Sequence, residues 1–222
     1  MSKLQTKKTI MIEHVKPGDI EARSFEIIAK ELADRGIALD TEKDPVIRRA
    51  IHTSADFDYA HTLCFSDDAV RTAKDLIRSG ADIVTDTNMA LTGINKKRLA
   101  AYGGSAHCYM ADETVAAEAK ERGITRASVS MEHAARDAIA SGRKTIFAIG
   151  NAPTALITLR EMYDEGIFVP DFVIGVPVGF VNVVEAKELI LETDIPHIIN
   201  RGRKGGSNVA AAIVNALLYT ME

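Results

Sequence analysis

The chain has 222 residues, 46% of them hydrophobic, which is enough apolar material for a buried core and argues against a disordered protein. Its net charge is -4 and it contains no basic block, so non-specific binding to nucleic acid is not expected. Cys64 and Cys108 make no C-x-x-C pair, and no apolar run approaches the roughly 20 residues of a membrane span. These features predict a soluble, cytoplasmic protein in a reducing compartment.

Two sequence periodicities alternate along the chain. A short extension at residues 1–9 lacks the apolar core of a signal peptide, and helices are expected next at about 20–35 and 45–54. Short apolar runs then predict strands at 61–65, 82–85, 105–109, 145–149, 171–176 and 197–200. Helical patterns follow them at 67–79, 112–122, 127–141, 153–165, 184–192 and 207–219. Glycines stand where several of these helices should end, at Gly80, Gly123, Gly142 and Gly166.

Several of the strand runs are continuously apolar, as at Ile146 to Ile149, which is typical of strands covered on both faces. Their alternation with helices predicts an α/β fold, a three-layer α/β/α sandwich with a mostly parallel sheet. No linker or change of composition divides the chain. Residues 1–222 are therefore expected to form a single domain, apart from the short extension.

Four loops of unusual sequence are expected at one edge of this sheet, at 86–89, 150–154, 175–182 and 200–207. Ligands of open α/β sheets bind beyond the carboxyl ends of the strands, where these loops should lie. Three of the loops are glycine-bearing turns that lead into helices, and free N–H groups there favour an anion. Ordinary strand-to-helix turns would explain any single loop equally well, but four such loops at one edge favour a ligand site.

The helix expected at 45–54 carries a candidate catalytic residue. Its apolar face comprises Val46, Ile47, Ala50 and Ile51. His52 points roughly away from that face, and Arg49 lies one turn earlier, so the two side chains should be neighbours. This pattern leaves two interpretations of His52, a solvated surface residue or one that faces a cleft. Ser24 instead lies on an apolar stripe, where a hydroxyl usually bonds back to a carbonyl one turn earlier.

Several common catalytic motifs are absent from the sequence. There is no G-x-x-x-x-G-K-[ST] phosphate loop and no early G-x-G-x-x-G dinucleotide motif. The sequence also lacks the G-x-S-x-G turn of serine hydrolases. Because no H-E-x-x-H or similar cluster occurs, a protein-bound metal is not expected either.

Six segments that run in order along nearly the whole chain resemble the precorrin-8X methylmutase family, also called precorrin isomerases, of the cobalamin pathway. They are Arg23-Ser24-Phe25, Arg49-Ala50-Ile51-His52, Asp86 with Met89 and Gly93, Ile149-Gly150-Asn151-Ala152-Pro153-Thr154-Ala155-Leu156, Gly175-Val176-Pro177-Val178-Gly179-Phe180-Val181, and Arg201-Gly202-Arg203-Lys204-Gly205-Gly206-Ser207. One element departs: the family often has Ser-Lys after a glutamate, whereas Ala186-Lys187 follows Glu185 here. No role of that serine is carried over.

The resemblance implies an isomerase that moves a methyl group from C-11 to C-12 of (cobalt-)precorrin-8, giving hydrogenobyrinate or cobyrinate, with no added cofactor. The family's catalytic histidine falls on His52, as proton donor and acceptor, and its substrate-binding serine and arginine fall on Ser24 and Arg49. Further substrate-binding residues are expected in the four loops, at Asp86, Met89, Asn151, Thr154, Gly179, Phe180, Arg201, Gly205 and Ser207. The family is homodimeric with its pocket near the interface, so a homodimer is expected.

The physical chemistry of the residues agrees with this implied reaction. A methyl shift around a conjugated ring depends on the tautomer of the ring, and a histidine can place the deciding proton because its pKa lies near neutral pH. Holding the macrocycle in a reactive conformation would lower the barrier further. Two alternatives stay open: a non-catalytic corrinoid carrier, and another α/β enzyme acting on a small phosphorylated or carboxylated metabolite. Substrates with and without cobalt are both compatible with the sequence.

Overall fold

The computed structural model describes residues 12–221, so the extension expected at 1–9 lies outside the described residues. A six-stranded sheet has the strand order β1-β6-β5-β4-β2-β3. The strands are β1 (Leu63–Phe65), β2 (Asp82–Thr85), β3 (Ala106–His107), β4 (Thr145–Ile149), β5 (Phe172–Gly175) and β6 (His197–Asn200). Only β1 runs antiparallel to its neighbour among these strands, so the predicted α/β class with a mostly parallel sheet is confirmed.

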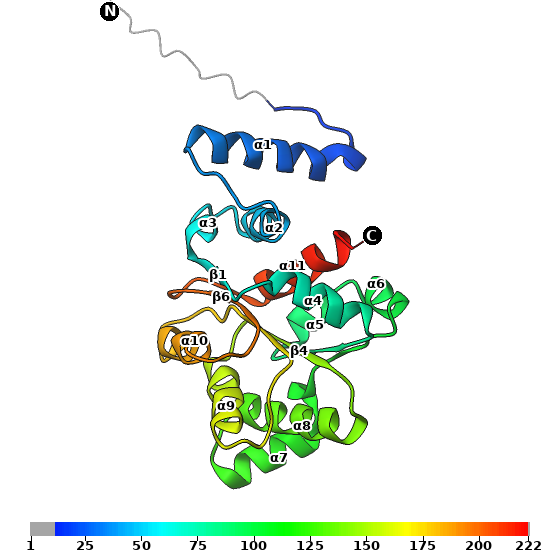
Figure 1. Cartoon of the computed structure of the whole chain (residues 1–222), viewed down its shortest axis with the longest axis vertical. Helices are drawn as coiled ribbons and strands as arrows, with labels where there is room; N and C mark the ends of the chain where they lie inside the picture. Colours follow the sequence, from blue (N-terminus) through cyan, green and yellow to red (C-terminus); the bar gives the residue numbers. More distant parts are fainter. Residues whose placement is uncertain (1–11, 222) are drawn as a thin grey trace, which may run out of the picture.

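Helices cover both faces of the sheet (Figure 1). In chain order they are η1 (Pro17–Asp19), α1 (Ile20–Asp34), α2 (Asp44–Ser54), α3 (Tyr59–Thr62), α4 (Ala69–Arg78), α5 (Asn88–Gly93), α6 (Lys96–Ala101), η2 (Tyr109–Ala111), α7 (Glu113–Arg122), α8 (Arg126–Ser141), α9 (Pro153–Asp164), α10 (Val183–Leu191) and α11 (Ser207–Tyr219). Helices α4, α5 and α11 belong to one side, and α8, α9 and α10 to the other.

The continuous apolar runs of the strands supply two cores, because successive side chains point to opposite faces. The core on the α11 side contains Ile83, Ile146, Ala148, Ile174 and Ile198. The core on the α8 side contains Val84, Phe147, Ile149, Val173 and Ile199. Burying each large side chain of this kind stabilises the fold by about 1.5–3 kcal/mol. The continuous pattern therefore fixes the three layers, since polar residues on either face would leave one layer without a core.

On one side of the sheet the helices are stacked several deep. Helix α11 is rich in alanine and buried nearly all round, because it packs against β4 and β5 and also carries α2. Helix α1 packs on α2 and stands farthest from the sheet (Figure 1). Asn208 joins the first turn of α11 to the C-terminal end of α2. Its side-chain amide donates to the carbonyl of Thr53 at 3.4 Å.

The boundaries differ from the predicted ones at the ends of the sheet. Of the strand expected at 61–65, the first two residues belong to α3, and the strand expected at 105–109 keeps two residues before the 3₁₀ turn η2. Helices α5 and α6 were not predicted, and their N-caps are the side chains of Thr87 and Asn95. Within residues 12–221, no helix is long and apolar enough to cross a membrane. Cys64 and Cys108 are both free.

Candidate active site

A groove about 400 Å³ in volume lies where α1, α2, α5 and α11 meet. Its polar lining comprises Glu21 from α1, Arg49, His52 and Thr53 from α2, and Asn208, Asn215 and Tyr219 from α11. Met89 and Gly93 of α5 complete the wall nearest the carboxyl end of β2. The groove therefore joins the helix that carries His52 to the sheet edge at which a ligand was expected.

His52 faces this groove because the opposite side of α2 is fixed in the core by its apolar residues. The imidazole ring stacks on the phenyl ring of Phe25 in α1, with centroids 5.1 Å apart and planes inclined by 30°. Within the described part of the chain, no hydrogen-bond partner occupies either ring nitrogen. Of the two interpretations, the structure supports a histidine that faces a cleft.

Arg49 is held beside His52 by three groups. One guanidinium nitrogen lies 2.7 Å from a carboxylate oxygen of Glu21. The guanidinium carbon also lies 4.7 Å from the ring centroid of Phe25 and 5.2 Å from that of Tyr219. Cation–π contacts of this kind favour a fixed orientation of the cation. Helical spacing predicted that Arg49 and His52 would be neighbours, and both line the same groove.

Ser24 makes the bond that a helical serine ordinarily makes. Its hydroxyl donates to the carbonyl of Ile20 at 2.8 Å, one turn earlier in α1. Ser24 does not line the groove, although the next residue, Phe25, contacts both Arg49 and His52. A direct contact of Ser24 with substrate stays a prediction.

Asp86 is not exposed at the loop surface, where a substrate-binding residue was expected. It is buried, and its carboxylate accepts backbone N–H bonds from Gly150 at 2.9 Å, Asn151 at 2.8 Å and Ala152 at 2.6 Å. Burial raises the pKa of Asp86, whereas the three donors favour its ionised form. Because its carboxylate is buried and accepts three N–H groups of the β4–α9 loop, Asp86 organises that loop and is not exposed at the surface.

The β6–α11 loop carries three cations with unequal partners. The ammonium of Lys204 lies 2.6 Å from the carboxylates of both Asp56 and Asp58, and these bonds raise the pKa of Lys204. Arg201 lies 3.3 Å from Glu188 at the surface. In residues 12–221 no carboxylate pairs with Arg203. Among the three, Arg203 is therefore the cation that a substrate carboxylate would reach without displacing an acid.

The remaining predicted residues lie in loops that are tied to one another. The hydroxyls of Ser207 and Thr87 are 2.8 Å apart, and those of Thr154 and Thr125 are also 2.8 Å apart. The N–H of Gly179 donates to the carbonyl of Arg203 at 3.2 Å, which links the loops after β5 and β6. Asn151 is exposed. The loops thus form one connected edge, at which the role of each residue toward substrate stays a prediction.

Gly205 stands where the chain passes closest to the neighbouring loop. A Cβ atom at Gly205 would lie 2.0 Å from the carbonyl oxygen of Val176, which no side chain permits. The N–H of the next residue, Gly206, donates to that same carbonyl at 2.9 Å. Glycine is therefore required at position 205 for the two loops to meet.

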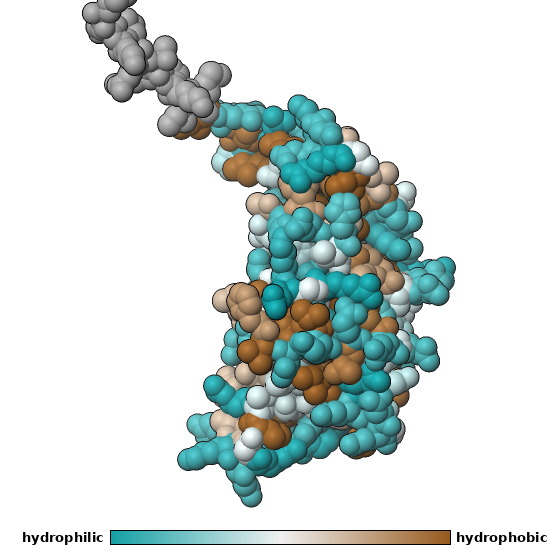
Figure 2. All heavy atoms as spheres, turned by 90° about the vertical axis from the view of Figure 1, so that its left-hand side faces the viewer, coloured by the Kyte–Doolittle hydropathy of each residue, from teal (hydrophilic) through white to brown (hydrophobic). Residues whose placement is uncertain are grey.

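Two large apolar side chains project from this edge into solvent. Met89 is 70% exposed and Phe180 is 82% exposed, and Val181 beside Phe180 is also exposed. The guanidinium of Arg203 lies 5.7 Å from the Phe180 ring centroid. Figure 2 shows apolar side chains gathered on this flank of the molecule at the height of α10. Neither Met89 nor Phe180 belongs to the core, so both are available to a ligand or a partner.

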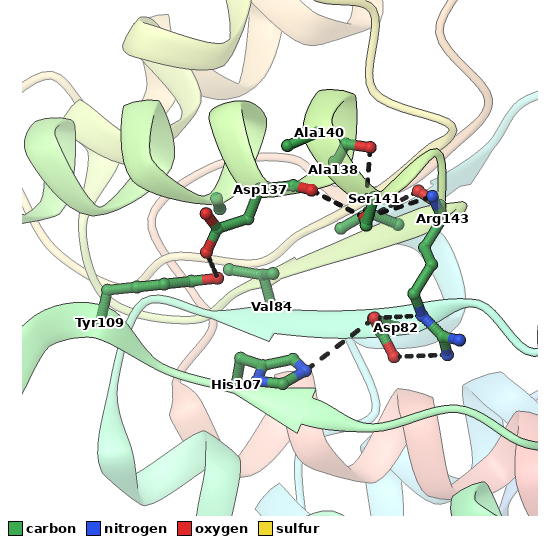
Figure 3. A pocket seen from close by; sticks show the side chains of 11 residues that line it. Asp82, Val84, His107, Tyr109, Asp137, Ala138, Ala140, Ser141 and Arg143 are labelled. Carbon is green, nitrogen blue, oxygen red and sulfur yellow. Dashed lines mark hydrogen bonds and ion pairs between the residues drawn. The ribbon is translucent and has the colours of Figure 1, made fainter.

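A second cavity, of about 450 Å³, lies at the opposite edge of the sheet between β3 and α8 (Figure 3). Its charged groups bond to one another. Arg143 donates to both carboxylate oxygens of Asp82 at 2.7 and 2.9 Å, and the hydroxyl of Tyr109 donates to Asp137 at 2.7 Å. Arg143 also donates to the carbonyls of Gly80 and Gly103. This cluster joins the starts of neighbouring strands and lies away from His52.

Sequence reasoning missed part of the groove. Asn208, Asn215 and Tyr219 recur at spacings that place them on one face of α11, so helical periodicity could have found them. Lys187 was noted only as part of a departure from a motif, yet it is fully buried with its ammonium in hydrogen bonds. No local pattern around Lys187 distinguishes it from a surface lysine.

Comparison with known proteins decides the family. A family model described as precorrin-8X methylmutase matches residues 19–220. The cobalt-precorrin-8 methylmutase of Priestia megaterium is 43% identical over 203 residues, which cover 91% of this chain and 88% of that protein. The chain belongs to the precorrin-8X methylmutase family.

Further members of the precorrin-8X methylmutase family agree in sequence and in fold. The cobalt-precorrin-8 methylmutase of Salmonella typhimurium is 44% identical over 209 residues, covering 93% of this chain and 96% of that one. The solved structure of a precorrin-8x methyl mutase from Thermus thermophilus has a TM-score of 0.79 at 37% identity, covering 90% and 96% of the two chains. The predicted resemblance is therefore confirmed.

Membership of the precorrin-8X methylmutase family makes this chain an enzyme, an isomerase of cobalamin biosynthesis that shifts a methyl group within its substrate. Its substrate is a corrinoid precursor. The alternative of another α/β enzyme acting on a small phosphorylated or carboxylated metabolite is thereby set aside. The groove is the candidate site of this isomerase, because it brings an arginine and two asparagines together with a histidine whose ring nitrogens make no hydrogen bond within residues 12–221.

Proposed function

We propose that this protein moves a methyl group from C-11 to C-12 of (cobalt-)precorrin-8, giving hydrogenobyrinate or cobyrinate, with His52 as proton donor and acceptor. The observation that carries the proposal is the setting of His52 in the groove. Its imidazole is held by stacking on Phe25 while its nitrogens make no hydrogen bond to the described residues. A ring held by its face and open at its edge can exchange a proton with a bound molecule.

The chemistry asked of His52 is limited to moving one proton. Protonation of a ring nitrogen of the substrate would favour the tautomer from which the methyl group migrates, and the proton returns to His52 afterwards. The methyl group leaves one ring carbon and joins the next within the same molecule, so no electrons are gained or lost overall. Orientation of the macrocycle against His52 would supply the rest of the rate enhancement.

Arg49 is proposed to bind a carboxylate of the substrate. Glu21 holds its guanidinium in the free protein, but the Glu21 side chain is 57% exposed and can turn away into water. A substrate carboxylate would then replace Glu21 while Phe25 and Tyr219 keep the guanidinium in place. The exchange of one carboxylate for another would keep the charge of Arg49 paired throughout.

The strand-end loops are proposed to bind the rest of the ring. Met89 and Phe180 would contact its apolar face, and Gly205 and Ser207 belong to the loop that would meet its carboxylate rim. Asn151, Thr154, Gly179 and Arg201 remain proposed contacts whose partners on the substrate are unassigned. Ser24, which precedes Phe25 in α1, is proposed to contact the substrate. Asp86 is proposed to hold the β4–α9 loop and not to contact the substrate directly.

We propose that the protein forms a homodimer whose partner subunit completes the groove. We also propose that the protein is cytoplasmic. Helix α1 carries the exposed residues Ile20 and Ile27 and contacts the rest of the fold mainly through α2. A partner subunit that covered this helix would bury their apolar surface and shield the groove from water. The free Cys64 and Cys108 are consistent with a reducing compartment.

The proposal is tested by turnover of the purified protein and of the His52→Ala variant on precorrin-8 or its cobalt form, followed through the visible absorption spectrum. Wild type is expected to convert many equivalents. His52→Ala is expected to bind hydrogenobyrinate with unchanged stoichiometry and to lose turnover by at least about 100-fold, as for loss of a general acid–base group. A His52→Ala variant with near-normal rate would contradict the role of His52. A wild-type spectrum that changes only stoichiometrically would instead support the carrier alternative.

A further inference from the structure

Two buried charges of opposite sign lie beneath the loops of the proposed site. Asp86 and Lys187 are both 0% exposed. Asp86 accepts three N–H groups of the β4–α9 loop. Lys187, on α10, donates its ammonium protons to the carbonyls of Gly202 at 2.7 Å and of Lys204 at 2.9 Å in the β6–α11 loop. One loop is thus anchored by its N–H groups, and the other by its carbonyl groups.

Asp86 binds backbone N–H groups and Lys187 binds backbone carbonyl groups. The two loops therefore differ in which backbone groups remain without a hydrogen bond to the described residues. In the β4–α9 loop, the N–H groups from Gly150 to Ala152 are consumed by Asp86, and Pro153 has none. In the β6–α11 loop, the N–H groups of Gly202, Arg203, Lys204 and Gly205 find no acceptor among the described residues. Of these two loops, the β6–α11 loop therefore has the run of donors to offer to an anion.

The anchoring of the β6–α11 loop involves a second amide. Asn200, at the end of β6, donates to the carbonyl of Lys204 at 2.8 Å, and its own side-chain oxygen accepts from the hydroxyl of Thr62 at 2.6 Å. Two donors therefore hold the Lys204 carbonyl, and one holds that of Gly202. Each carbonyl shares a peptide plane with the N–H group of the next residue, so fixing the carbonyls of Gly202 and Lys204 fixes the directions of the N–H groups of Arg203 and Gly205.

A buried ammonium is a costly way to fix two carbonyls. Burial lowers the pKa of Lys187 to about 8, because the apolar interior disfavours the charged form. A neutral amide could hold the same carbonyls at lower cost. What the lysine adds is positive charge directly behind the loop, whose Arg203 has no carboxylate partner among residues 12–221. An anion at this loop would gain from the added charge.

We infer that Lys187 is a positioning residue that holds the N–H groups of Arg203 and Gly205 ready for a carboxylate of the substrate rim, while the β4–α9 loop receives none. The inference rests on the proposed function, because it takes the ligand to be a corrinoid rimmed with carboxylates. It names the loop that meets the rim and the buried group responsible. Lys187 itself touches no substrate, since two backbone carbonyls separate it from the surface.

The first test measures binding of two probes, hydrogenobyrinate and the same ring with its carboxylates converted to methyl esters, to wild type and to Lys187→Met. Wild type is expected to prefer the acid. Lys187→Met is expected to weaken binding of the acid by about tenfold and to leave ester binding within twofold. Lys144→Met, which removes a surface lysine paired with Asp171 at the far edge, is the matched control and is expected to change neither.

Equal weakening of both probes by Lys187→Met would reduce Lys187 to a structural role and overturn the inference. Wild type that binds the acid and the ester equally well would also overturn it, while leaving the proposed function intact. Wild type that binds neither probe would remove the proposed function and this inference together. Turnover by wild type is measured alongside. It is expected where both probes bind equally well, and it is expected to be absent where neither probe binds.

A second measurement needs no variant and holds even if Lys187→Met fails to fold. Amide hydrogen exchange of free wild type is expected to be slow at Gly150 to Ala152, where Asp86 accepts the protons, and fast at Gly202 to Gly205. Saturation with hydrogenobyrinate is expected to slow exchange at Arg203 and Gly205 by at least tenfold, and the methyl ester is not. Unchanged exchange at these two amides in the acid complex would overturn the inference.

Discussion

The imidazole of His52 lies against the phenyl ring of Phe25, with centroids 5.1 Å apart and planes inclined by 30°. The two residues come from different helices, so the stack depends on how α1 packs on α2. Phe25 also lies under the guanidinium of Arg49, at 4.7 Å. A single aromatic ring of α1 therefore orients Arg49 and His52, two of the polar residues of α2 that face the groove.

Replacing Phe25 should reduce turnover more than substrate binding. Phe25→Leu keeps an apolar side chain but removes the stack, so we expect kcat to fall about two- to tenfold, in line with an aromatic pair worth about 0.5–1.5 kcal/mol. Phe25→Tyr keeps the ring and should stay within twofold of wild type. Steady-state kinetics on the corrinoid substrate would measure both. If Phe25→Leu had the kcat of Phe25→Tyr, the ring would not be orienting His52.

Asp86→Asn should destabilise the fold although it changes a single atom. The side-chain amide would direct an NH₂ group at backbone donors of the β4–α9 loop, where a carboxylate oxygen now accepts two N–H bonds. We expect a loss of about 2–4 kcal/mol in the free energy of unfolding, measured in urea. Asp112→Asn, at an exposed position whose side chain makes no cap bond, is the control and should change little. Equal midpoints for the two variants would show that Asp86 does not hold the loop.

Gly205→Ala should disturb the meeting of the loops after β5 and β6. The added methyl group would lie 2.0 Å from the carbonyl oxygen of Val176, a backbone atom directly after β5 that accepts a hydrogen bond from Gly206. We expect at least about tenfold weaker binding of hydrogenobyrinate and a loss of about 1–3 kcal/mol in stability, as for an overpacked site. Gly18→Ala meets nothing within 4 Å and is the matched control. Binding titrations and thermal unfolding of both variants would decide, and unchanged binding by Gly205→Ala would exclude a close fit.

The layers of this fold could be predicted from the sequence because they depend on local periodicity. The strands at Thr145–Ile149 and His197–Asn200 and the helix at Ser207–Tyr219 lie where the apolar patterns placed them. Helices α5 and α6 were missed because each is only six residues long and depends on a side-chain cap rather than on an apolar stripe. Short elements of this kind carry too few residues for periodicity to show.

The site could be predicted only in part, for a related reason. Helical spacing placed His52 and Arg49 together, since both lie on one helix. It could not show that Asp86 would be occupied by a loop 64 residues away, or that Lys187 would be buried beneath another. Those facts depend on the order of strands in the sheet, which brings β2 beside β4 and α10 beside β6. A local sequence pattern does not reveal contacts that depend on the topology of the sheet.

Lys187 should leave a signature in the pH dependence of stability. Burial lowers its pKa in the folded protein to about 8 from the ordinary value of 10.5. Between these two pH values the folded protein binds fewer protons at Lys187 than the unfolded chain does, so the free energy of unfolding rises with pH. We expect wild type to gain about 1–3 kcal/mol relative to Lys187→Met from pH 7.5 to pH 10.5, measured by urea unfolding. Taking the difference between the two proteins cancels the titration of every other group they share, including Tyr59, whose pKa burial raises to about 12. A flat difference across this range would mean that Lys187 keeps its ordinary pKa in the fold, and that its charge is compensated by groups other than the two loop carbonyls.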